Sequence, residues 1–396
     1  MKKISSIYNW KRLTPDDGHY FFGYYDRNPW NADQSLHLMM KIDQMQRLPL
    51  PGETAEVGAV TPNGEYRKYL DTRAWCHQQG CMELFYPGST NQFIYNDFDP
   101  QTGRLQARLY EIGKGEIKRY NRSIYALAPN GKFAVSLDIG RIPRRGYSYA
   151  DTPVGDQRFP EDLDNDGLFM IDLATGEEKL IASYRSMIEN HPYFYTAEDK
   201  YIWLNHAIVN CDSDRVLWLF RQTINQHQVR SWQTFMFTSD LSGKDISCVL
   251  PEVYWNRAIS HQIWGRTKHE ILIDPKWNAG PTAGHNAVVL NDNEHPFKAV
   301  KLSDSHGMMS HMIFSPDGTK LLADSYPDAE GMQTLALIDP ATGKMDILGK
   351  FNHTPEYEWI GDTRNDLHPR WSPDGRYITV DSIHDNKFRA CYLLEI

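Results

Sequence analysis

The sequence has no long hydrophobic run, and this absence limits where we expect the protein to reside. A membrane-spanning helix needs about 20 mostly apolar residues in a row, and no stretch of the 396-residue chain offers them. The first residues, MKKISSIYNWKRL, have a basic tip but lack the apolar segment of a secretory signal. We therefore expect a cytoplasmic protein that binds no membrane.

Cysteine is scarce and has no pattern. The five cysteines form no Cys-x-x-Cys pair, and their odd number does not suit a framework of disulfides. The formal net charge of -9 excludes the broadly basic surface that binds nucleic acid. Linker-like tracts and short metal motifs such as His-Glu-x-x-His are absent as well. These absences favour a single globular domain with reduced thiols.

The sequence does have many aromatic side chains and an internal repeat. Aromatic residues make up 12% of the chain, which suits packed β-sheets and surfaces that bind sugars. The segment HMIFSPDGTKLLAD at residues 311–324 returns as HPRWSPDGRYITVD at 368–381 and as YALAPNGKFAVSLD at 125–138. Weaker copies begin near Trp30, Phe85, His191 and His261.

Each repeat is typical of one four-stranded antiparallel sheet. A short strand meets a Pro-Asp-Gly turn and an apolar strand follows, while a turn such as DPATG at residues 339–343 precedes the fourth strand. Seven units of about 57 residues fill the chain. The pattern predicts an all-β, seven-bladed β-propeller that forms one domain over residues 1–396. The last unit supplies only three strands, so we expect residues 4–13 to complete that blade and close the ring.

Two connections, residues 140–166 and 206–230, are expected to be long loops. Both would leave the end of a second strand and overhang one mouth of the central channel. They contain basic residues, namely Arg141, Arg144, Arg145, Arg221 and Arg230. Arginines over the channel of an acidic protein indicate a small anionic ligand held by paired hydrogen bonds. Alternatively, the loops only cap the channel and the arginines anchor them.

Four repeats carry a histidine at the start of their first strand: His191, His261, His311 and His368. The first strand of a propeller blade is the innermost, so equivalent strand starts lie on one ring around the axis. A single histidine in such a place is usually a structural residue. Four together repel one another when charged and lose hydrogen bonds when buried. A bound metal, a catalytic role or an anionic ligand resolves that conflict.

Carboxylates accompany the histidines. Asp366 lies two residues before His368, so both side chains point to the same side of an extended chain. Asp324 and Asp381 end second strands near the same mouth, where an aspartate can also simply bond backbone amides. Imidazole and carboxylate without cysteine suit Mn²⁺, Fe²⁺, Zn²⁺ or Ni²⁺.

Three segments of the C-terminal half resemble the oligogalacturonate lyases, polysaccharide lyase family 22. They are ISHQIW at residues 259–264, MSHMIFSPDG at 309–318 and DTRNDLHPRW at 362–371. The resemblance covers roughly residues 200–396. It implies a seven-bladed propeller in which histidines of neighbouring blades hold Mn²⁺.

Carried onto this sequence, the resemblance gives His311 and His368 as metal ligands. Asp366 stands where the family has a further histidine, and we expect it to complete the set. Thr363 is nearest to the position of the family's glutamine ligand. The family also uses an arginine base on the fourth blade, for which Arg230 is the best match.

Two segments of the N-terminal half do not match that family, although they also fall at blade starts. They are FFGYYDRNPW at residues 21–30 and HQQGCMELFYP at 77–87. A different first half implies a different substrate. From these segments and the ring we expect the following substrate contacts: Tyr24, Arg27, Gln79, Arg141 and His191.

The resemblance implies a lyase of carbohydrate metabolism that cleaves a uronic-acid-containing oligosaccharide by β-elimination. Arg230 or His261 would remove the proton next to the uronate carboxylate, and a small anionic saccharide would be the partner. A glycoside hydrolase is the first alternative and would need two carboxylates from among Asp26, Asp324 and Asp366. The second alternative is a non-catalytic propeller that binds a saccharide or a protein.

Overall fold

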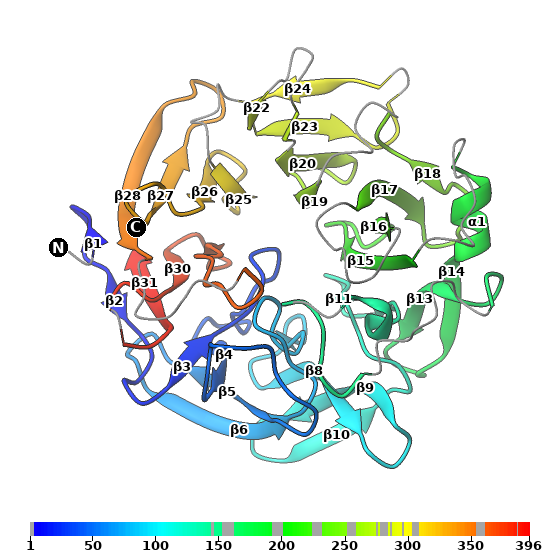
Figure 1. Cartoon of the computed structure of the whole chain (residues 1–396), viewed down its shortest axis with the longest axis horizontal. Coiled ribbons are helices and arrows are strands. Elements are labelled where there is room, and N and C mark those ends of the chain that lie inside the picture. The colour runs from blue at the N-terminus through cyan, green and yellow to red at the C-terminus, as the bar shows by residue number, and fades with distance from the viewer. Residues whose placement is uncertain are drawn as a thin grey trace.

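Seven small antiparallel sheets surround a central axis in the computed structural model of the protein (Figure 1). The chain is therefore the seven-bladed β-propeller that its repeat predicts. The structure describes residues 4–143, 146–152, 162–191, 201–223, 232–251, 259–274, 276–277, 284–285, 287–294, 297–302, 309–353, 361–385 and 387–396.

The first four blades follow one another along the chain, and the strands of each blade run outward from the axis in chain order. The first consists of β3 (His19–Phe21), β4 (His37–Ile42), β5 (Ala55–Val60) and β6 (Tyr66–Thr72). The second consists of β7 (Leu84–Phe85), β8 (Gln92–Asp99), β9 (Arg104–Glu111) and β10 (Gly115–Arg119). The third consists of β11 (Ala126–Leu127), β12 (Phe133–Ser136), β13 (Gly167–Asp172) and β14 (Glu178–Ser183). The fourth consists of β15 (Tyr201–Val209), β16 (Arg215–Thr223), β17 (Gln233–Asp240) and β18 (Ser247–Cys248).

Three more blades complete the ring. The fifth consists of β19 (Ser260–Trp264), β20 (Glu270–Asp274), β23 (Val288–Asn291) and β24 (Ala299–Lys301), with β21 (Lys276–Trp277) and β22 (Gly284–His285) pairing as a separate ribbon. The sixth consists of β25 (Met309–Phe314), β26 (Leu321–Ser325), β27 (Met332–Ile338) and β28 (Met345–Asn352). The seventh consists of β29 (Arg370–Trp371), β30 (Tyr377–Ser382) and β31 (Ala390–Glu395).

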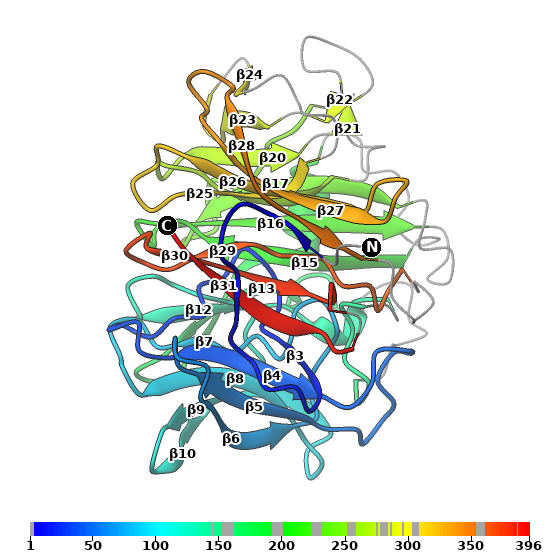
Figure 2. The ribbon, with the colours of Figure 1, turned by 90° about the vertical axis from the view of Figure 1, so that its left-hand side faces the viewer.

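The N-terminal segment closes the ring. Strand β2 (Lys11–Arg12) pairs antiparallel with β31 and supplies the missing fourth strand of the seventh blade. Strand β1 (Ile4–Ser5) pairs with β28 and so extends the sixth blade as well. Figure 2 shows this segment in dark blue across the outer edges of the orange and red blades. Closure by the chain's own start leaves fewer exposed sheet edges.

The hydrophobic core lies between the faces of neighbouring blades. Leu217 and Leu219 of β16, for example, pack in one cluster with Ile271 and Ile273 of β20. A middle strand of a blade is covered on both faces by neighbouring blades, so its sequence is a nearly continuous run of apolar residues. That is the pattern of the sequence VLWLF in β16.

The predicted turns between the first two strands of each blade are present. In the sixth blade the amide of Gly318 donates to the carbonyl of Ser315 over 2.8 Å, and in the seventh Gly375 donates to Ser372 over 2.9 Å. Both glycines have φ angles above +70°, a left-handed conformation that a side chain disfavours. These turns define one end of the channel, which we call the turn end. The end where the innermost strands begin is called the mouth.

The second predicted long loop, residues 206–230, is wrong over residues 206–223, and residues 224–230 lie outside the described part of the chain. Residues 137–166 do connect β12 to β13, with a short 3₁₀ helix η1 (Ile139–Arg141) at the start. Residues 201–223, however, form the two longest strands of the fourth blade, joined by a tight turn. Both strands are rich in apolar residues that are buried between neighbouring blades. This burial favours a pair of strands over a long loop, although the residues between the two strands are polar.

The repeat boundary near His191 is also wrong. His191 follows helix α1 (Tyr184–Glu189), and the innermost strand of the fourth blade begins later, at Tyr201. Neither helix approaches the length and apolarity needed to cross a membrane, and the described part of the chain contains no other.

Candidate functional site

Local irregularities of the innermost strands position histidines at the mouth. The pairing register shifts between Asn205 and Ile208 in β15, between Ser260 and Ile263 in β19, and between Met309 and Met312 in β25. A bulge of this kind re-aims a side chain out of the sheet. Each of these three bulges contains one histidine: His206, His261 and His311.

Three of the mouth histidines also have an unusual backbone. The φ angles of His206, His261 and His368 are +51°, +55° and +43°. This left-handed conformation costs a non-glycine residue about 1–2 kcal/mol. Such a cost persists where the surrounding structure fixes the residue, and it is most frequent at functional sites.

The structure brings the histidine rings of three successive blades together. The ring centroids of His261 and His311 are 4.4 Å apart, and those of His311 and His368 are 4.5 Å apart. Tyr24 of the first blade reaches the same point, with its ring 4.9 Å from His368 and 5.1 Å from His206.

Tyr24 belongs to a segment that crosses the channel. Pairing within the first blade stops after Phe21 and resumes at the bridge between Trp30 and His37. We call residues 22–29, which lie between, the channel loop. Its Tyr24 and Tyr25 both contact the ring of His311 in the sixth blade, at 5.8 and 5.1 Å. Figure 1 shows this dark blue segment reaching the centre of the ring.

Carboxylates at the ends of second strands orient two of the histidines. Asp324 of β26 contacts Nδ1 of His311 at 2.9 and 3.0 Å and also accepts the backbone amides of His311 and His368. Asp274 of β20 lies 3.5 Å from Nδ1 of His261. A carboxylate at Nδ1 fixes the tautomer and directs Nε2 away from the sheet, as in metal sites.

Asp381, the corresponding residue of β30, has a different role. Its carboxylate pairs with the buried guanidinium groups of Arg370 and Arg389, at 2.9 and 3.2 Å. Arg370 donates to the carbonyl of Gly23 in the channel loop, and Arg389 donates to the carbonyl of His77. Asp381 therefore fixes the channel loop where the ring closes and does not join the histidines.

Three side chains at the mouth have donor atoms close enough to hold a metal ion. One atom from each of His311, Asp366 and His368 lies within 4.8 Å of the others, and all three residues are buried. We call these residues the mouth cluster. Nε2 of His311 and both ring nitrogens of His368 have no hydrogen-bond partner among the described residues. Unpaired buried nitrogens are costly, and two imidazoles with one carboxylate suit Mn²⁺, Fe²⁺ or Zn²⁺. The donor set therefore fits a divalent metal.

The electrostatics of the mouth cluster keep these donors in metal-binding form. Burial, with added repulsion from His311 and Arg370, holds the pKa of His368 well below its ordinary value, so the ring is neutral. Burial alone would raise the pKa of Asp366. The guanidinium of Arg364, 2.9 Å away, and the neighbouring histidines, His311 first, together outweigh burial, so this pKa is below its usual range and the carboxyl is ionised.

A cavity of about 150 Å³ lies next to His261 and Arg364, which contact His311 and Asp366 of the mouth cluster. Its wall includes His261, two arginines and two tyrosines, and the full lining is Ile142, Pro143, Tyr147, Trp203, Asn205, Arg221, Trp232, Ser260, His261, Tyr326 and Arg364. Arg221 of β16 donates to the carbonyl of Ile259 at 2.9 Å. The hydroxyl of Tyr326 lies 3.4 Å from Nε2 of His261. The cavity thus presents cations, hydroxyls and an imidazole to a ligand.

The structure brings some of the predicted site residues together and separates others. His261, His311, Asp366, His368 and Tyr24 meet at the mouth. Arg230 lies outside the described residues.

His191, Arg141 and Gln79 lie elsewhere. His191 packs on Phe235 of β17, the third strand of its blade, with ring centroids 4.3 Å apart. Arg141 donates to the carbonyl of Ile202, and Gln79 accepts from the hydroxyl of Tyr125. His191 therefore does not open an innermost strand, because its blade begins only after α1. Arg27, in contrast, lines a cavity toward the turn end.

Sequence reasoning missed His206, Tyr25 and Tyr326. A signal for His206 exists, because Asn-His-Ala-Ile at residues 205–208 has the same form as Ser-His-Gln-Ile at 260–263 and Ser-His-Met-Ile at 310–313. Tyr25 carries no comparable signal, since the channel loop matches no other repeat, and Tyr326 directly follows β26, where the repeats share no residue type.

Comparison with solved structures shows the same architecture in known enzymes. An oligogalacturonate lyase in complex with manganese has a TM-score of 0.65 at 15% sequence identity, over 99% of this chain and 94% of that one. The oligogalacturonate lyase of Vibrio parahaemolyticus has a TM-score of 0.60 at 13% identity, over 99% and 98%. Prolyl oligopeptidase B from Galerina marginata has a TM-score of 0.53 at 9% identity, over 93% of this chain and 48% of that one.

No family model matches the chain, and no curated protein matches its sequence. In structure, the resemblance extends beyond residues 200–396 to the N-terminal half. The chain therefore has the seven-bladed propeller fold of the oligogalacturonate lyases over nearly its full length.

Proposed function

We propose that the protein is a metal-dependent lyase that cleaves short uronic-acid-containing oligosaccharides by β-elimination. The observation that carries this proposal is the mouth cluster, with its buried, unpaired imidazole nitrogens and its ionised carboxylate. Two neighbours of the cluster, His261 and Arg364, line a cavity that also contains Arg221. A soluble oligosaccharide of a few sugar units could enter through the mouth and place one uronate in this cavity.

The reaction begins with loss of a weakly acidic proton. The proton lies next to a carboxylate that is already negative, so its removal requires that this charge be neutralised. Arg221 and Arg364 line the cavity and would bind the carboxylate. His311, Asp366 and His368 would hold the divalent metal, with Mn²⁺ as the first choice. When bound, such an ion stabilises the negative charge that develops on the carboxylate.

His261 is the proposed base. Its ring lies in the cavity wall, and imidazole changes its protonation near neutral pH, whereas a guanidinium stays protonated. Asp274 and Ser310 on the Nδ1 side hold the ring in place. The family resemblance instead assigns the base to an arginine of the fourth blade. Arg221 is the arginine of that blade that lines the cavity, and we give it the role of carboxylate ligand.

Tyr326 would donate a proton to the leaving oxygen. Burial raises the pKa of its phenol, so the hydroxyl keeps its proton at neutral pH. Its position beside Nε2 of His261 places acid and base on the same wall of the cavity. A hydrolase is less well supported, because Asp324 is engaged by His311 and Asp366 by Arg364.

The test uses trigalacturonate as substrate, with and without added Mn²⁺. Elimination leaves a conjugated double bond, so a lyase produces ultraviolet-absorbing products, whereas a hydrolase produces new reducing ends without absorbance. We expect His261→Ala to lower kcat by about 10²–10⁴-fold, and Arg221→Lys mainly to raise KM. A loss of kcat in Arg221→Lys with retained kcat in His261→Ala would move the base to Arg221. Absence of either product from uronate oligosaccharides would contradict the proposal.

A further inference from the structure

Arg364 lies between the mouth cluster and the cavity of about 150 Å³. Its Nε is 2.9 Å from a carboxylate oxygen of Asp366, whose side chain is 1% exposed and does not line the cavity. Arg364 itself lines the cavity, and its side chain is 14% exposed. One guanidinium thus contacts a proposed metal ligand on one side and the proposed substrate cavity on the other.

The three nitrogens of this guanidinium have different surroundings. Nε donates to Asp366 over 3.1 Å, and Nη1 donates to the carbonyl of Gly361. Nη2 donates to no residue in the described part of the chain, yet it is not among the enclosed polar atoms. Arg364 therefore keeps accessible N–H groups with which it can bind a ligand in the cavity while it pairs with Asp366.

Arg221, the second arginine of the cavity, has partners of another kind. Its Nη2 donates to the carbonyl of Ile259 over 2.9 Å and contacts the hydroxyl of Ser260 at 3.0 Å. Both of these groups are neutral, and neither belongs to the mouth cluster. The two arginines are therefore a matched pair for comparison, because both line the cavity but only Arg364 shares a carboxylate with the mouth cluster.

In the proposed reaction the carboxylate of Asp366 serves two positive charges. Without a metal, Asp366 balances the charge of Arg364, and a guanidinium that is already balanced attracts a second carboxylate weakly. When Asp366 ligates a divalent ion, its negative charge is shared, and more of the charge of Arg364 is left unbalanced. Because the pair is buried, water screens this charge poorly. A uronate carboxylate in the cavity then restores the balance.

We propose that Asp366 and Arg364 couple the metal to the substrate, so that metal binding at the mouth cluster strengthens the hold of Arg364 on a uronate carboxylate. This inference rests on the proposed function, which supplies both the metal and the uronate. Coupling of two binding sites is reciprocal, so uronate raises the affinity for the metal by the same factor. A neutral sugar in the cavity is not coupled, because it brings no charge to Arg364.

The test measures binding of galacturonate, which has no glycosidic bond to cleave. Calorimetric titration of the full-length protein compares its affinity in metal-free buffer and at saturating Mn²⁺. We expect galacturonate to bind about tenfold more tightly with Mn²⁺, which corresponds to about 1.4 kcal/mol, and galactose, which lacks the carboxylate, to show no gain. The paramagnetic resonance signal of free Mn²⁺ should show the same gain in metal affinity when galacturonate is added. His311→Ala, which is expected to lose the metal, controls for binding of Mn²⁺ by the sugar itself.

Matched variants assign the coupling to one arginine. Arg364→Gln should reduce the gain to less than about twofold, whereas Arg221→Gln should weaken galacturonate binding with and without Mn²⁺ and keep the gain. If Arg364→Gln fails to fold, Arg364→Lys serves instead. It keeps the charge but loses the planar fork of donors, so its gain should be smaller than that of the wild-type protein.

Three results would overturn the coupling. The first is equal affinity of the wild-type protein for galacturonate with and without Mn²⁺, even if trigalacturonate is cleaved. The second is a full gain in Arg364→Gln or Arg364→Lys, which would mean that the metal acts on the uronate without Arg364. The third is failure of galacturonate to bind at about 10 mM with Mn²⁺ present. A gain that depends on Arg364 in a protein that cleaves no uronate oligosaccharide would contradict the proposed reaction and leave the coupling in place.

Discussion

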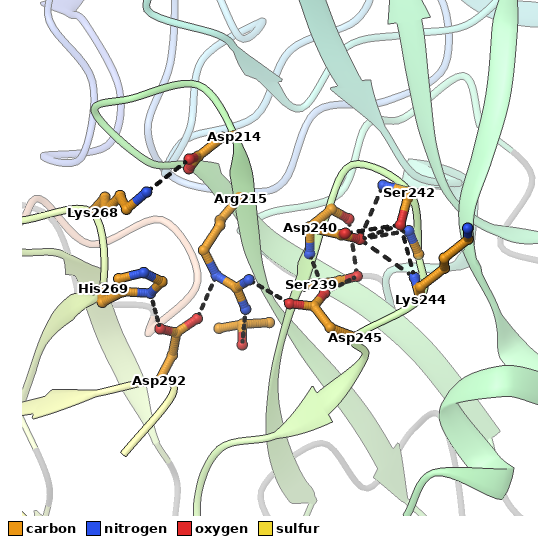
Figure 3. Close-up of polar contacts among 12 residues, drawn as sticks. Asp214, Arg215, Ser239, Asp240, Ser242, Lys244, Asp245, Lys268, His269 and Asp292 are labelled. Carbon is orange, nitrogen blue, oxygen red and sulfur yellow. Dashed lines mark hydrogen bonds and ion pairs between the residues drawn. The ribbon is translucent and has the colours of Figure 1, made fainter.

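Two sets of histidine, aspartate and arginine in this chain differ in whether their polar atoms are satisfied. In the first, Asp292 lies 2.8 Å from Nδ1 of His269 and 2.7 Å from Nε of Arg215, and Arg215 also pairs with Asp245 (Figure 3). We call Arg215, His269 and Asp292 the paired network. It links the fourth blade to the fifth near the turn end, and its carboxylate has a partner on each oxygen.

The mouth cluster also contains histidine and aspartate, and Arg364 pairs with its Asp366, but several of its ring nitrogens lack hydrogen-bond partners. His311 is oriented by Asp324 through Nδ1, but Nε2 has no hydrogen-bond partner in the described chain, and neither ring nitrogen of His368 has one. Asp366 is 3.8 Å from Nε2 of His368, which is too far for a hydrogen bond. The difference shows what separates a structural histidine from a candidate functional one. The two sets differ in burial, because the side chain of His269 is 28% exposed and those of His311 and His368 are at most 1% exposed, and they differ in whether the ring nitrogens have partners.

The largest expected effect separates the two sets by metal content. His311→Ala and His368→Ala should each lose bound Mn²⁺ and lower activity roughly a thousandfold, since loss of a supporting residue alone costs about 10–100-fold in metal affinity. His269→Ala, in the paired network, should retain both. Metal analysis of the purified variants and the ultraviolet assay measure these quantities. Full metal content in both mouth variants would show that the cluster is not the metal site.

The next largest effect concerns stability. Here we expect the variant of the paired network to lose more than the variant of the mouth cluster. Asp292→Asn should lower the free energy of unfolding by about 2 kcal/mol, because the largely buried Arg215 loses its buried carboxylate and keeps only the exposed Asp245. His368→Leu should leave the stability of the metal-free protein within about 1 kcal/mol, because it removes nitrogens that are buried without partners. Denaturant unfolding of both variants measures the difference. Equal losses would show that the mouth cluster is as well paired as the network.

The fold and part of the mouth could be predicted from the sequence for the same reason. A propeller repeats one unit, so the aligned positions of His261, His311 and His368 predict that they meet at the axis. The repeat also predicts closure by the N-terminal segment, because its last unit lacks a strand.

Other parts of the site could not be predicted in this way. His206 was missed because the repeat of the fourth blade was placed at His191, before α1, although the pattern of residues 205–208 matches that of the next two blades. The channel loop has no counterpart in other repeats. Its path across the axis depends on contacts with distant residues, such as the bond from Arg370 to the carbonyl of Gly23.

The smallest expected effect concerns a buried histidine, His37, whose partners are neutral. His37 has Nδ1 2.8 Å from the carbonyl of Leu38 and Nε2 3.2 Å from the hydroxyl of Thr379. Burial, followed by repulsion from Arg370, lowers the pKa of this ring to about 3. The unfolded chain therefore takes up a proton near pH 6.5 that the folded protein does not accept until about pH 3. The stability that this histidine contributes is complete above pH 6.5 and declines as the pH falls toward 3.

Between about pH 7.5 and about pH 5.5 the wild-type protein should therefore lose about 1.4 kcal/mol more stability than His37→Gln. His37→Gln is expected to be less stable at both values, because it disturbs a buried position, so the comparison rests on the change with pH and not on the absolute values. Denaturant unfolding at the two pH values measures it. An equal loss in both proteins would mean that His37 accepts a proton in the folded state. A buried imidazole with neutral partners could then be protonated in the folded protein. In that case the partners of a histidine would not by themselves explain the difference between the paired network and the mouth cluster.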